Sequence, residues 1–423
     1  MNSQFFLLYI DPGTGSMLFS VFIGAATTLF FLARAFFIRL QIFLSGGKKD
    51  SLSKSKIPYA IYTDSKRYWN VFKPVCEEFE RRSLPLVYFT QSPDDPALSA
   101  TYKNIKAEFI GEGNKGFNKL NFLNCDVLLS STPGVDVLQW KRSKYTKHYA
   151  HIPHTVDDKV GYRMFGLDYY DSVLLTGDYQ AADIREIESL RGIKKKELVT
   201  VGSTYMDAAL EHLKKLPAYA GPDMNNLKVL LAPSWGPSAI LSRFGSKIID
   251  ALLATGFEII VRPHPQSKIS EKEMLDSLMD KYKDTPHITW NFDNDNLAVL
   301  NSADILITDF SGVVFDYTLL CDRPIIYADT KFDPRPYDAG CLDHPMWRFE
   351  ILKDLGIKLD ENDFPRIKEV IEQTIKSENL AQGRAKAKAQ AWMHIGESAK
   401  RTVDFLEEKY REINSEKKNQ ESE

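Results

Sequence analysis

The sequence predicts an α/β protein with two doubly wound, Rossmann-like domains behind an N-terminal membrane helix. Three observations support this fold class. Short apolar runs alternate with amphipathic helical patterns through most of the 423 residues, as in parallel sheets covered on both faces. A polar break at 216–226 divides these runs into two series. The first 45 residues contain an uncharged stretch long enough to cross a bilayer.

The composition is that of a protein with more than one hydrophobic core. Hydrophobic residues make up 43% of the chain and charged residues 26%, and the net charge is −3. A net charge this close to zero predicts no general affinity for nucleic acid. The four cysteines are scattered and form no Cys-x-x-Cys pair, which favours reduced core residues over a disulfide framework or a zinc site.

The N-terminal segment, residues 1–45, is predicted to be a membrane anchor. Residues 12–33 carry no charge, and a helix of this length spans ~33 Å at ~1.5 Å per residue. Arginines and lysines follow the stretch and none precedes it, so the positive-inside rule places the rest of the chain in the cytoplasm, on the inner side of the cell membrane. A re-entrant or interfacial segment is an alternative. A cleaved signal peptide is another, although it would need a basic start, which residues 1–10 lack.

A basic linker, 46–56, leads into the first domain, which we assign to residues 57–218. The lysines of the linker would be attracted to anionic lipid by ~1 kcal/mol each. Strands are predicted at PYAIYT, LPLVYF, AEFIG, DVLLSS, KHYAHI, DSVLLTG and LVTVG, and an amphipathic helix at 66–82. Alternation of strands and helices predicts a parallel sheet.

The second domain is assigned to residues 226–378. Its predicted strands are KVLLAP, FEIIVRPHP, HITW, DILIT and PIIYA, which would form a five-stranded doubly wound sheet. Two such domains joined by a short linker predict ligand binding in the cleft between them. Residues 379–423 are predicted to form a C-terminal helix and a charged tail, with the last residues solvated and disordered.

The stretch LNSADILITDFSGVVFDYTLL places a turn where ligands bind in doubly wound sheets, beyond the carboxyl end of a strand. Ser311 is placed to cap a helix that starts at Gly312, whose free N–H groups would attract a phosphate. Gly312 has no Cβ, so a phosphate could approach the backbone closely. Asp309 could accept hydrogen bonds from ligand hydroxyls. Asp316 lies inside an apolar run and needs a polar partner if it is buried.

Two further strands end in loops suited to phosphate. In RPHPQ, the Arg262 guanidinium can donate two parallel hydrogen bonds to phosphate oxygens, and the prolines restrict the loop so that Arg262 and His264 stay at the sheet edge. A hydrogen-bonded loop role is the alternative for His264. In APSWG, Ser234 follows a third strand. Together with the turn at 309–312, these loops predict a phosphate-binding edge.

The first domain contributes the segment HIPHTVDDK, which holds two histidines, His151 and His154. Histidine is the side chain best suited to proton transfer near neutral pH. No third histidine or cysteine follows at zinc-like spacing, so no metal site is predicted. His151 continues the strand and should point into the domain, whereas His154 lies beyond Pro153 and should face the cleft. We assign His154 as the catalytic base, with His151 as the alternative.

These motifs resemble those of the CDP-glycerol glycerophosphotransferase family, the polymerases and primases of teichoic-acid-like polymers. The segments APSW, RPHP and ADILITDFSGVVFDY carry the resemblance, which extends over about 58–378. It implies a GT-B architecture, with two Rossmann-like domains and the active site between them. It also implies association with the cytoplasmic face of the membrane and lipid-linked acceptors.

The resemblance assigns roles to particular residues. Arg262 and His264 match the motif at the donor pyrophosphate, and Asp309, Ser311 and Gly312 match the nucleotide-phosphate turn, where Gly312 replaces the more common serine. The family motif Trp-His-Gly-Thr followed by lysine corresponds to HIPHT with Lys159, which lacks the tryptophan and the glycine. This match places Thr155 and Lys159 on the acceptor side.

The function predicted from the sequence is transfer of glycerol phosphate, or a related polyol phosphate, from a CDP-linked donor to an acceptor hydroxyl. The acceptor would be lipid-linked or a growing polymer in cell-wall teichoic acid synthesis, CMP would be released, and no cofactor would be needed. Alternatives are a CDP-ribitol donor, a sugar-nucleotide glycosyltransferase of the same fold, and a non-catalytic membrane scaffold.

Overall fold

The computed structural model describes residues 56–293, 295–328 and 332–420, with side chains up to 415, and the single positions 23, 27–29 and 33. The chain divides into two units, 1–55 and 56–423, and the second unit contains both sheets. Apart from these few positions, the predicted anchor lies outside the described residues, and so does the basic linker up to residue 55. Among the helices of the described part, none is both long enough and apolar enough to cross a membrane.

The first half of the larger unit is built on a seven-stranded parallel sheet with the strand order β3-β2-β1-β4-β5-β6-β7. Its strands are β1 (Ile57–Thr63), β2 (Leu86–Thr90), β3 (Ile105–Phe109), β4 (Cys125–Ser130), β5 (His148–His151), β6 (Ser172–Leu175) and β7 (Glu197–Thr200). Each of these strands coincides with an apolar run predicted from the sequence. The reversal of strand order at β1 and β4 creates the topological switch point at which doubly wound sheets bind ligands.

Helices cover this sheet and include α2 (Trp69–Arg81), α3 (Asn114–Leu120), α4 (Gln180–Arg191) and α5 (Thr204–Leu213). Short 3-10 turns are η2 (Lys66–Tyr68), η3 (Pro96–Leu98) and η4 (Lys159–Gly161). In α2, apolar side chains at 71, 72, 75, 76 and 79 fall on one face, because these positions recur at helical spacing. They pack into the core below β1 and β2, and this packing fixes the N-terminal end of α2 at the carboxyl edge of the sheet.

The second half is a six-stranded parallel sheet with the order β10-β9-β8-β11-β12-β13. Its strands are β8 (Lys228–Leu231), β9 (Glu258–Val261), β10 (Ile288–Trp290), β11 (Ile305–Thr308), β12 (Ile325–Ala328) and β13 (Gly356–Leu359). The sequence predicts five of these strands but not β13. This edge strand is short and contains an exposed lysine, so its sequence lacks a continuous apolar run.

The helices of the second half alternate with its strands and continue past the last one. They are α6 (Ile240–Phe244), α7 (Ser246–Leu253), α8 (Ser267–Ser270), α9 (Lys272–Lys281), α10 (Leu297–Ser302), α11 (Val313–Phe315), the π-helix η5 (Asp316–Leu320), η6 (Asp338–Cys341), α12 (Trp347–Glu350), α13 (Leu352–Leu355), η7 (Glu361–Arg366), α14 (Ile367–Ile375), α15 (Glu378–Ala391) and α16 (Ser398–Gln420). Two parallel sheets, each with helices around it, confirm the predicted α/β class.

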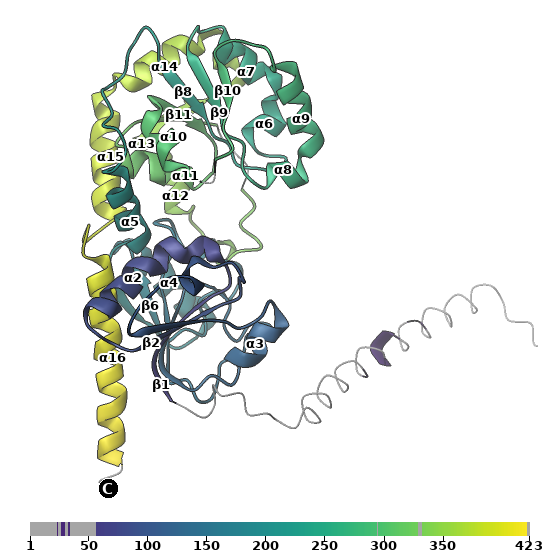
Figure 1. Cartoon of the computed structure of the whole chain (residues 1–423). Coiled ribbons are helices and arrows are strands. Elements are labelled where there is room, and N and C mark those ends of the chain that lie inside the picture. Colours follow the sequence, from purple (N-terminus) through teal and green to yellow (C-terminus); the bar gives the residue numbers. More distant parts are fainter. Residues whose placement is uncertain are drawn as a thin grey trace, which may run out of the picture. The chain divides into compact units, whose positions relative to one another are not determined.

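The C-terminal helices connect the two halves (Figure 1). α15 packs against α13 and η5 of the second half, whereas α16 returns to the first half and packs on α2 and β4. Val403, Phe405 and Leu406 of α16 are buried in the core of the first half. The expectation of a disordered tail is wrong as far as Gln420, since the backbone remains helical to that residue. Glutamate, lysine and glutamine are strong helix formers, which allows the polar segment to extend the packed helix.

Candidate active site

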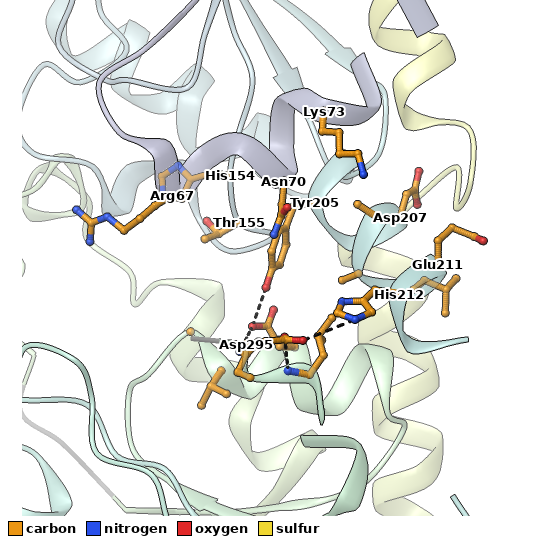
Figure 2. A pocket seen from close by; sticks show the side chains of 18 of the residues that line it. Arg67, Asn70, Lys73, His154, Thr155, Tyr205, Asp207, Glu211, His212 and Asp295 are labelled. Carbon is orange, nitrogen blue, oxygen red and sulfur yellow. Dashed lines mark hydrogen bonds and ion pairs between the residues drawn. The ribbon is translucent and has the colours of Figure 1, made fainter. Parts of the chain in front are cut away.

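A cavity of about 1350 Å³ lies between the two halves and is lined by both of them. The first half contributes the start of α2, the loop after β5 and the helix α5; the second half contributes the loops after β8, β9 and β11. Figure 2 labels lining side chains of the first half, among them His154 and Tyr205. The cavity brings together the predicted residues His154, Thr155, Arg262, His264, Ser311, Gly312 and Asp316. The predicted residues His151, Lys159, Ser234 and Asp309 do not line it.

The loop after β9 presents Arg262 and His264 to the cavity. The Arg262 guanidinium donates hydrogen bonds to the side chain of Asn291 and to the carbonyl of Asp293, the latter at 2.8 Å, so its position is set before any ligand binds. His264 Nδ1 accepts a hydrogen bond from the backbone N–H of Gln266 at 3.1 Å. A neutral ring therefore carries its proton on Nε2. Burial lowers the pKa of His264, which favours this neutral form.

Asp309 lies behind the cavity. It is fully buried, and its two carboxylate oxygens accept hydrogen bonds from the backbone N–H groups of Ser234 at 2.8 Å and Ile240 at 3.0 Å. The carboxylate therefore fastens the turn after β11 to the loop after β8. This geometry corrects the expectation that Asp309 meets ligand hydroxyls, and Ser234 is likewise buried in this junction. Both residues instead hold the turns in place.

The turn after β11 differs slightly from the expected helix cap. The helix α11 begins at Val313, one residue later than predicted, and Ser311 Oγ accepts from the N–H of Val313 at 3.5 Å. α11 has three residues and continues directly as the π-helix η5, so helical backbone follows the turn as predicted, although most of it is π-helix. A Cβ added at Gly312 would meet no atom within 4 Å. Gly312 therefore leaves open room for a ligand at the backbone.

Asp316 has the polar partners that its apolar surroundings require. The Tyr205 hydroxyl, on α5 of the first half, donates to Asp316 Oδ2 at 3.1 Å, and Asn296 Nδ2 lies 3.4 Å from the same oxygen. Burial raises the pKa of Asp316 to about 6 despite these bonds. The Tyr205–Asp316 contact joins the two halves at the wall of the cavity (Figure 2).

The two histidines of the first half occupy different environments. His151, at the end of β5, is fully buried, and its Nε2 lies 3.0 Å from the hydroxyl of Tyr162. Burial holds the pKa of His151 well below its usual value. His154 lines the cavity and packs against the Tyr68 ring at a centroid distance of 4.7 Å. Burial and then the positive charge of Lys159 lower the pKa of His154 to about 4, so this imidazole is neutral near pH 7 and can accept a proton.

Lys159 supports the loop that carries His154. Its ammonium is buried and donates to the carbonyl of Thr155 at 2.9 Å, and it lies 3.8 Å from Asp157 Oδ1. Burial lowers the pKa of Lys159 to about 8. This position corrects the expectation that Lys159 faces the acceptor, since the ammonium is used beneath the loop and outside the cavity lining.

Several residues at the cavity have no counterpart in the sequence prediction. Arg67 of η2 and Asn70 and Lys73 of α2 line the cavity. Arg67 is exposed, and after burial and Lys159 its charge also contributes to the low pKa of His154. Polar residues on the exposed face of an amphipathic helix occur in most proteins, so the sequence alone contained no signal for them. Within the described residues, no group of histidine, cysteine, aspartate or glutamate side chains could hold a metal ion.

One family model matches part of the chain, from the end of β6 in the first half to η6 in the second. The family model of CDP-glycerol:poly(glycerophosphate) glycerophosphotransferases matches residues 175–340. The predicted resemblance is confirmed. Over this stretch, which contains Arg262, His264, Asp309 and the turn after β11, the chain is CDP-glycerol glycerophosphotransferase-like. The loop with His151 and His154 precedes the matched stretch. No protein of curated function matches the chain.

Solved structures with the same arrangement of two sheets include enzymes of different chemistry. The wall teichoic acid polymerase TagF aligns at 16% identity and a TM-score of 0.51, over 84% of this chain and 89% of its own. Two UDP-GlcNAc 2-epimerases each align with a TM-score of 0.52. The enzyme of Methanocaldococcus jannaschii aligns at 16% identity, over 83% of this chain and 99% of its own. The enzyme of Neisseria meningitidis aligns at 15% identity, over 84% of this chain and 100% of its own. At these identities the comparison establishes a GT-B-like fold alone.

Proposed function

We propose that the chain transfers glycerol phosphate, or a related polyol phosphate, from a CDP-linked donor to an acceptor hydroxyl and releases CMP. One observation carries the proposal: a single cavity places the neutral His154 of the first half opposite Arg262, His264 and Gly312 of the second. The match of residues 175–340 to the glycerophosphotransferase family supports the choice of donor.

In the proposed reaction, the acceptor oxygen attacks the phosphorus atom of the donor that bears glycerol. A new P–O bond forms to the acceptor, the P–O bond to the CMP phosphate breaks, and CMP leaves with the bridging oxygen. His154 takes the proton of the acceptor hydroxyl, because its imidazole is neutral near pH 7. General base catalysis of this kind contributes ~10²–10⁴-fold to the rate.

Charge stabilisation is the second requirement, because negative charge is spread over the phosphoryl oxygens during transfer. Arg262 supplies a guanidinium that its contacts with Asn291 and Asp293 hold in place. His264 in its Nε2–H form can donate a hydrogen bond to a phosphate oxygen, and the open space at Gly312 leaves room for that oxygen beside the turn. From the opposite wall, Arg67 adds a positive charge beside His154. These groups would bind the diphosphate and stabilise the leaving CMP.

The acceptor and the location of the reaction are also part of the proposal. The uncharged stretch 12–33 and the basic residues after it support attachment to the cytoplasmic face of the cell membrane. An acceptor linked to lipid would be available there. TagF, a wall teichoic acid polymerase of the same fold, supports a role in the synthesis of such a polymer.

The proposal is tested by incubating the full-length chain with each of three donors, CDP-glycerol, CDP-ribitol and a UDP-sugar, and measuring nucleotide release. We expect release of CMP that depends on the acceptor, and little release of UDP. His154→Gln is the matched variant that should bind CDP-glycerol and release little CMP. UDP release would assign the chain to the glycosyltransferases. Nucleotide binding without any release would support the scaffold alternative.

A further inference from the structure

Arg348, at the start of α12, connects the two catalytic loops of the cavity. Its Nη1 donates to Asp157 Oδ2 at 2.8 Å, and its Nη2 donates to the backbone carbonyl of Phe310 at 2.8 Å. Asp157 belongs to the loop of His154 in the first half, and Phe310 precedes Ser311 in the phosphate turn of the second half. One guanidinium thus bridges segments 153 residues apart in sequence (310 − 157).

The contact on the first half is built into a buried network. Asp157 is buried and also accepts a hydrogen bond from the hydroxyl of Thr155, the residue that follows His154. Its neighbour Asp158 accepts from the backbone N–H groups of Trp347 at 2.8 Å and Arg348 at 2.9 Å. Two adjacent carboxylates of the His154 loop therefore hold both the backbone and the side chain of Arg348.

The charge of Arg348 stabilises the ionised form of Asp157 in this network. Burial alone would raise the pKa of Asp157, yet the positive charges of Arg348 and then Lys159 bring it below its usual value. A buried carboxylate that loses its partner is strongly unfavourable, so the loop would rearrange if Arg348 were removed. The bond to the Phe310 carbonyl depends on geometry, because a guanidinium holds its donors in a fixed planar fork that reaches two separated acceptors, whereas the donors of a lysine all lie on one nitrogen.

We propose that Arg348 is a positioning residue that sets the distance between His154 and the phosphate turn during transfer. It is not among the residues that line the cavity, so it acts through the two loops and not on the substrate. The inference rests on the proposed function, in which His154 and this turn must meet the same phosphorus and hydroxyl. Arg348, Asp157 and Asp158 all lie outside the stretch that matches the family model, 175–340.

The first test does not depend on activity. Hydrogen–deuterium exchange is compared between the wild-type chain, Arg348→Met, Arg348→Lys and the control Arg366→Met, whose guanidinium pairs with Asp363 on the surface. We expect Arg348→Met to increase exchange in both 154–159 and 310–313, and the control to change neither. Arg348→Lys should retain its contact with the carboxylate and lose the one with the neutral carbonyl, so that exchange increases in 310–313 alone.

The second test measures the consequence for transfer. Misplacement of reacting groups by ~1 Å can cost ~10²-fold in rate, so kcat for CMP release should fall by about this factor in Arg348→Met, while the Kd for CMP changes less than ~3-fold. Arg348→Lys should retain an intermediate kcat.

Several outcomes would overturn the inference. One is increased exchange confined to α12, and another is normal kcat in a variant whose two loops exchange faster. If Arg348→Met does not fold, the test rests on Arg348→Lys. In that variant, hydrogen–deuterium exchange of residues 310–313 at the wild-type rate would contradict the proposed bridge between the two loops. If the wild-type chain releases no CMP from any donor, the proposed function fails, and the exchange result still reports on the bridge separately.

Discussion

The low pKa of His154 gives a prediction that can be measured on one side chain. Lys159 supplies the largest electrostatic contribution to this shift, after burial. Replacing Lys159 by methionine removes the charge and keeps much of the volume of the side chain. Because a nearby positive charge disfavours protonation, the pKa of His154 must rise in Lys159→Met.

The size of the rise follows from the structure. The pKa of His154 is about 4, against 6.5 for an ordinary histidine, and burial, which is the larger cause, remains in the variant. We therefore expect a rise of ~1 unit, equivalent to ~1.4 kcal/mol between the two protonation states. Arg67→Met removes a smaller and solvent-exposed contribution, so its effect should have the same sign and be smaller, about half a unit.

The assay is the pH dependence of kcat/KM for CMP release, together with NMR titration of the His154 ring. A base must be neutral to act, so kcat/KM should fall as pH drops through the pKa of His154: near pH 4 in the wild type and near pH 5 in Lys159→Met. His154→Gln identifies the resonance by its absence. The same variant separates the titration of His154 from that of Asp316, whose pKa of about 6 could add a second inflection to the pH profile of kcat/KM.

Two results would refute this reasoning. One is a wild-type His154 that titrates near 6.5, which would mean that the ring is fully solvated. The other is a Lys159→Met variant, with a melting temperature close to that of the wild type, in which the pKa of His154 is unchanged or lower.

Further predictions concern the neighbouring residues. His151→Ala should lower the free energy of unfolding by ~1–3 kcal/mol, because the hydroxyl of Tyr162 loses its buried partner; a stable but inactive variant would transfer the catalytic role to His151. Asp309→Ala should lower stability by a similar ~1–3 kcal/mol, since two buried N–H groups lose their acceptor, and denaturant titration with wild-type stability would contradict this. Arg262→Met should weaken binding of CDP-glycerol by ~1.5–3 kcal/mol and of cytidine little; equal losses in calorimetry would show that Arg262 does not contact the diphosphate. Deletion of residues 1–45 should leave a folded and more soluble protein, and an unfolded product by circular dichroism would show that the segment belongs to the fold.

The sequence predicted the parts of the fold and site that depend on local pattern. Apolar runs placed the strands, and residues directly after a strand must lie at the carboxyl edge of a parallel sheet. For this reason Arg262, His264 and Gly312 were expected at one site and line one cavity. The turn made by Pro153 likewise separated a buried His151 from a cavity-facing His154.

What the sequence could not provide are contacts between distant segments. Asp309 binds the backbone of Ser234 and Ile240, which are 75 and 69 residues away, and backbone N–H groups have no sequence signature. The Asp157–Arg348 pair spans 191 residues, and each of its members would also be ordinary on a surface. In the same way, helical propensity predicted α16 but not its packing against α2.

The central claim is that His154 and the phosphate turn act together on a CDP-linked donor. The most direct measurement is acceptor-dependent CMP release from CDP-glycerol by the full-length chain, with calorimetric binding of CDP-glycerol measured on the same samples of wild type and His154→Gln. We expect the wild type to release CMP, and His154→Gln to bind the donor as tightly while its turnover falls by ~10²-fold or more. Equal CMP release by both proteins, or release of UDP from a UDP-sugar in place of CMP, would contradict it.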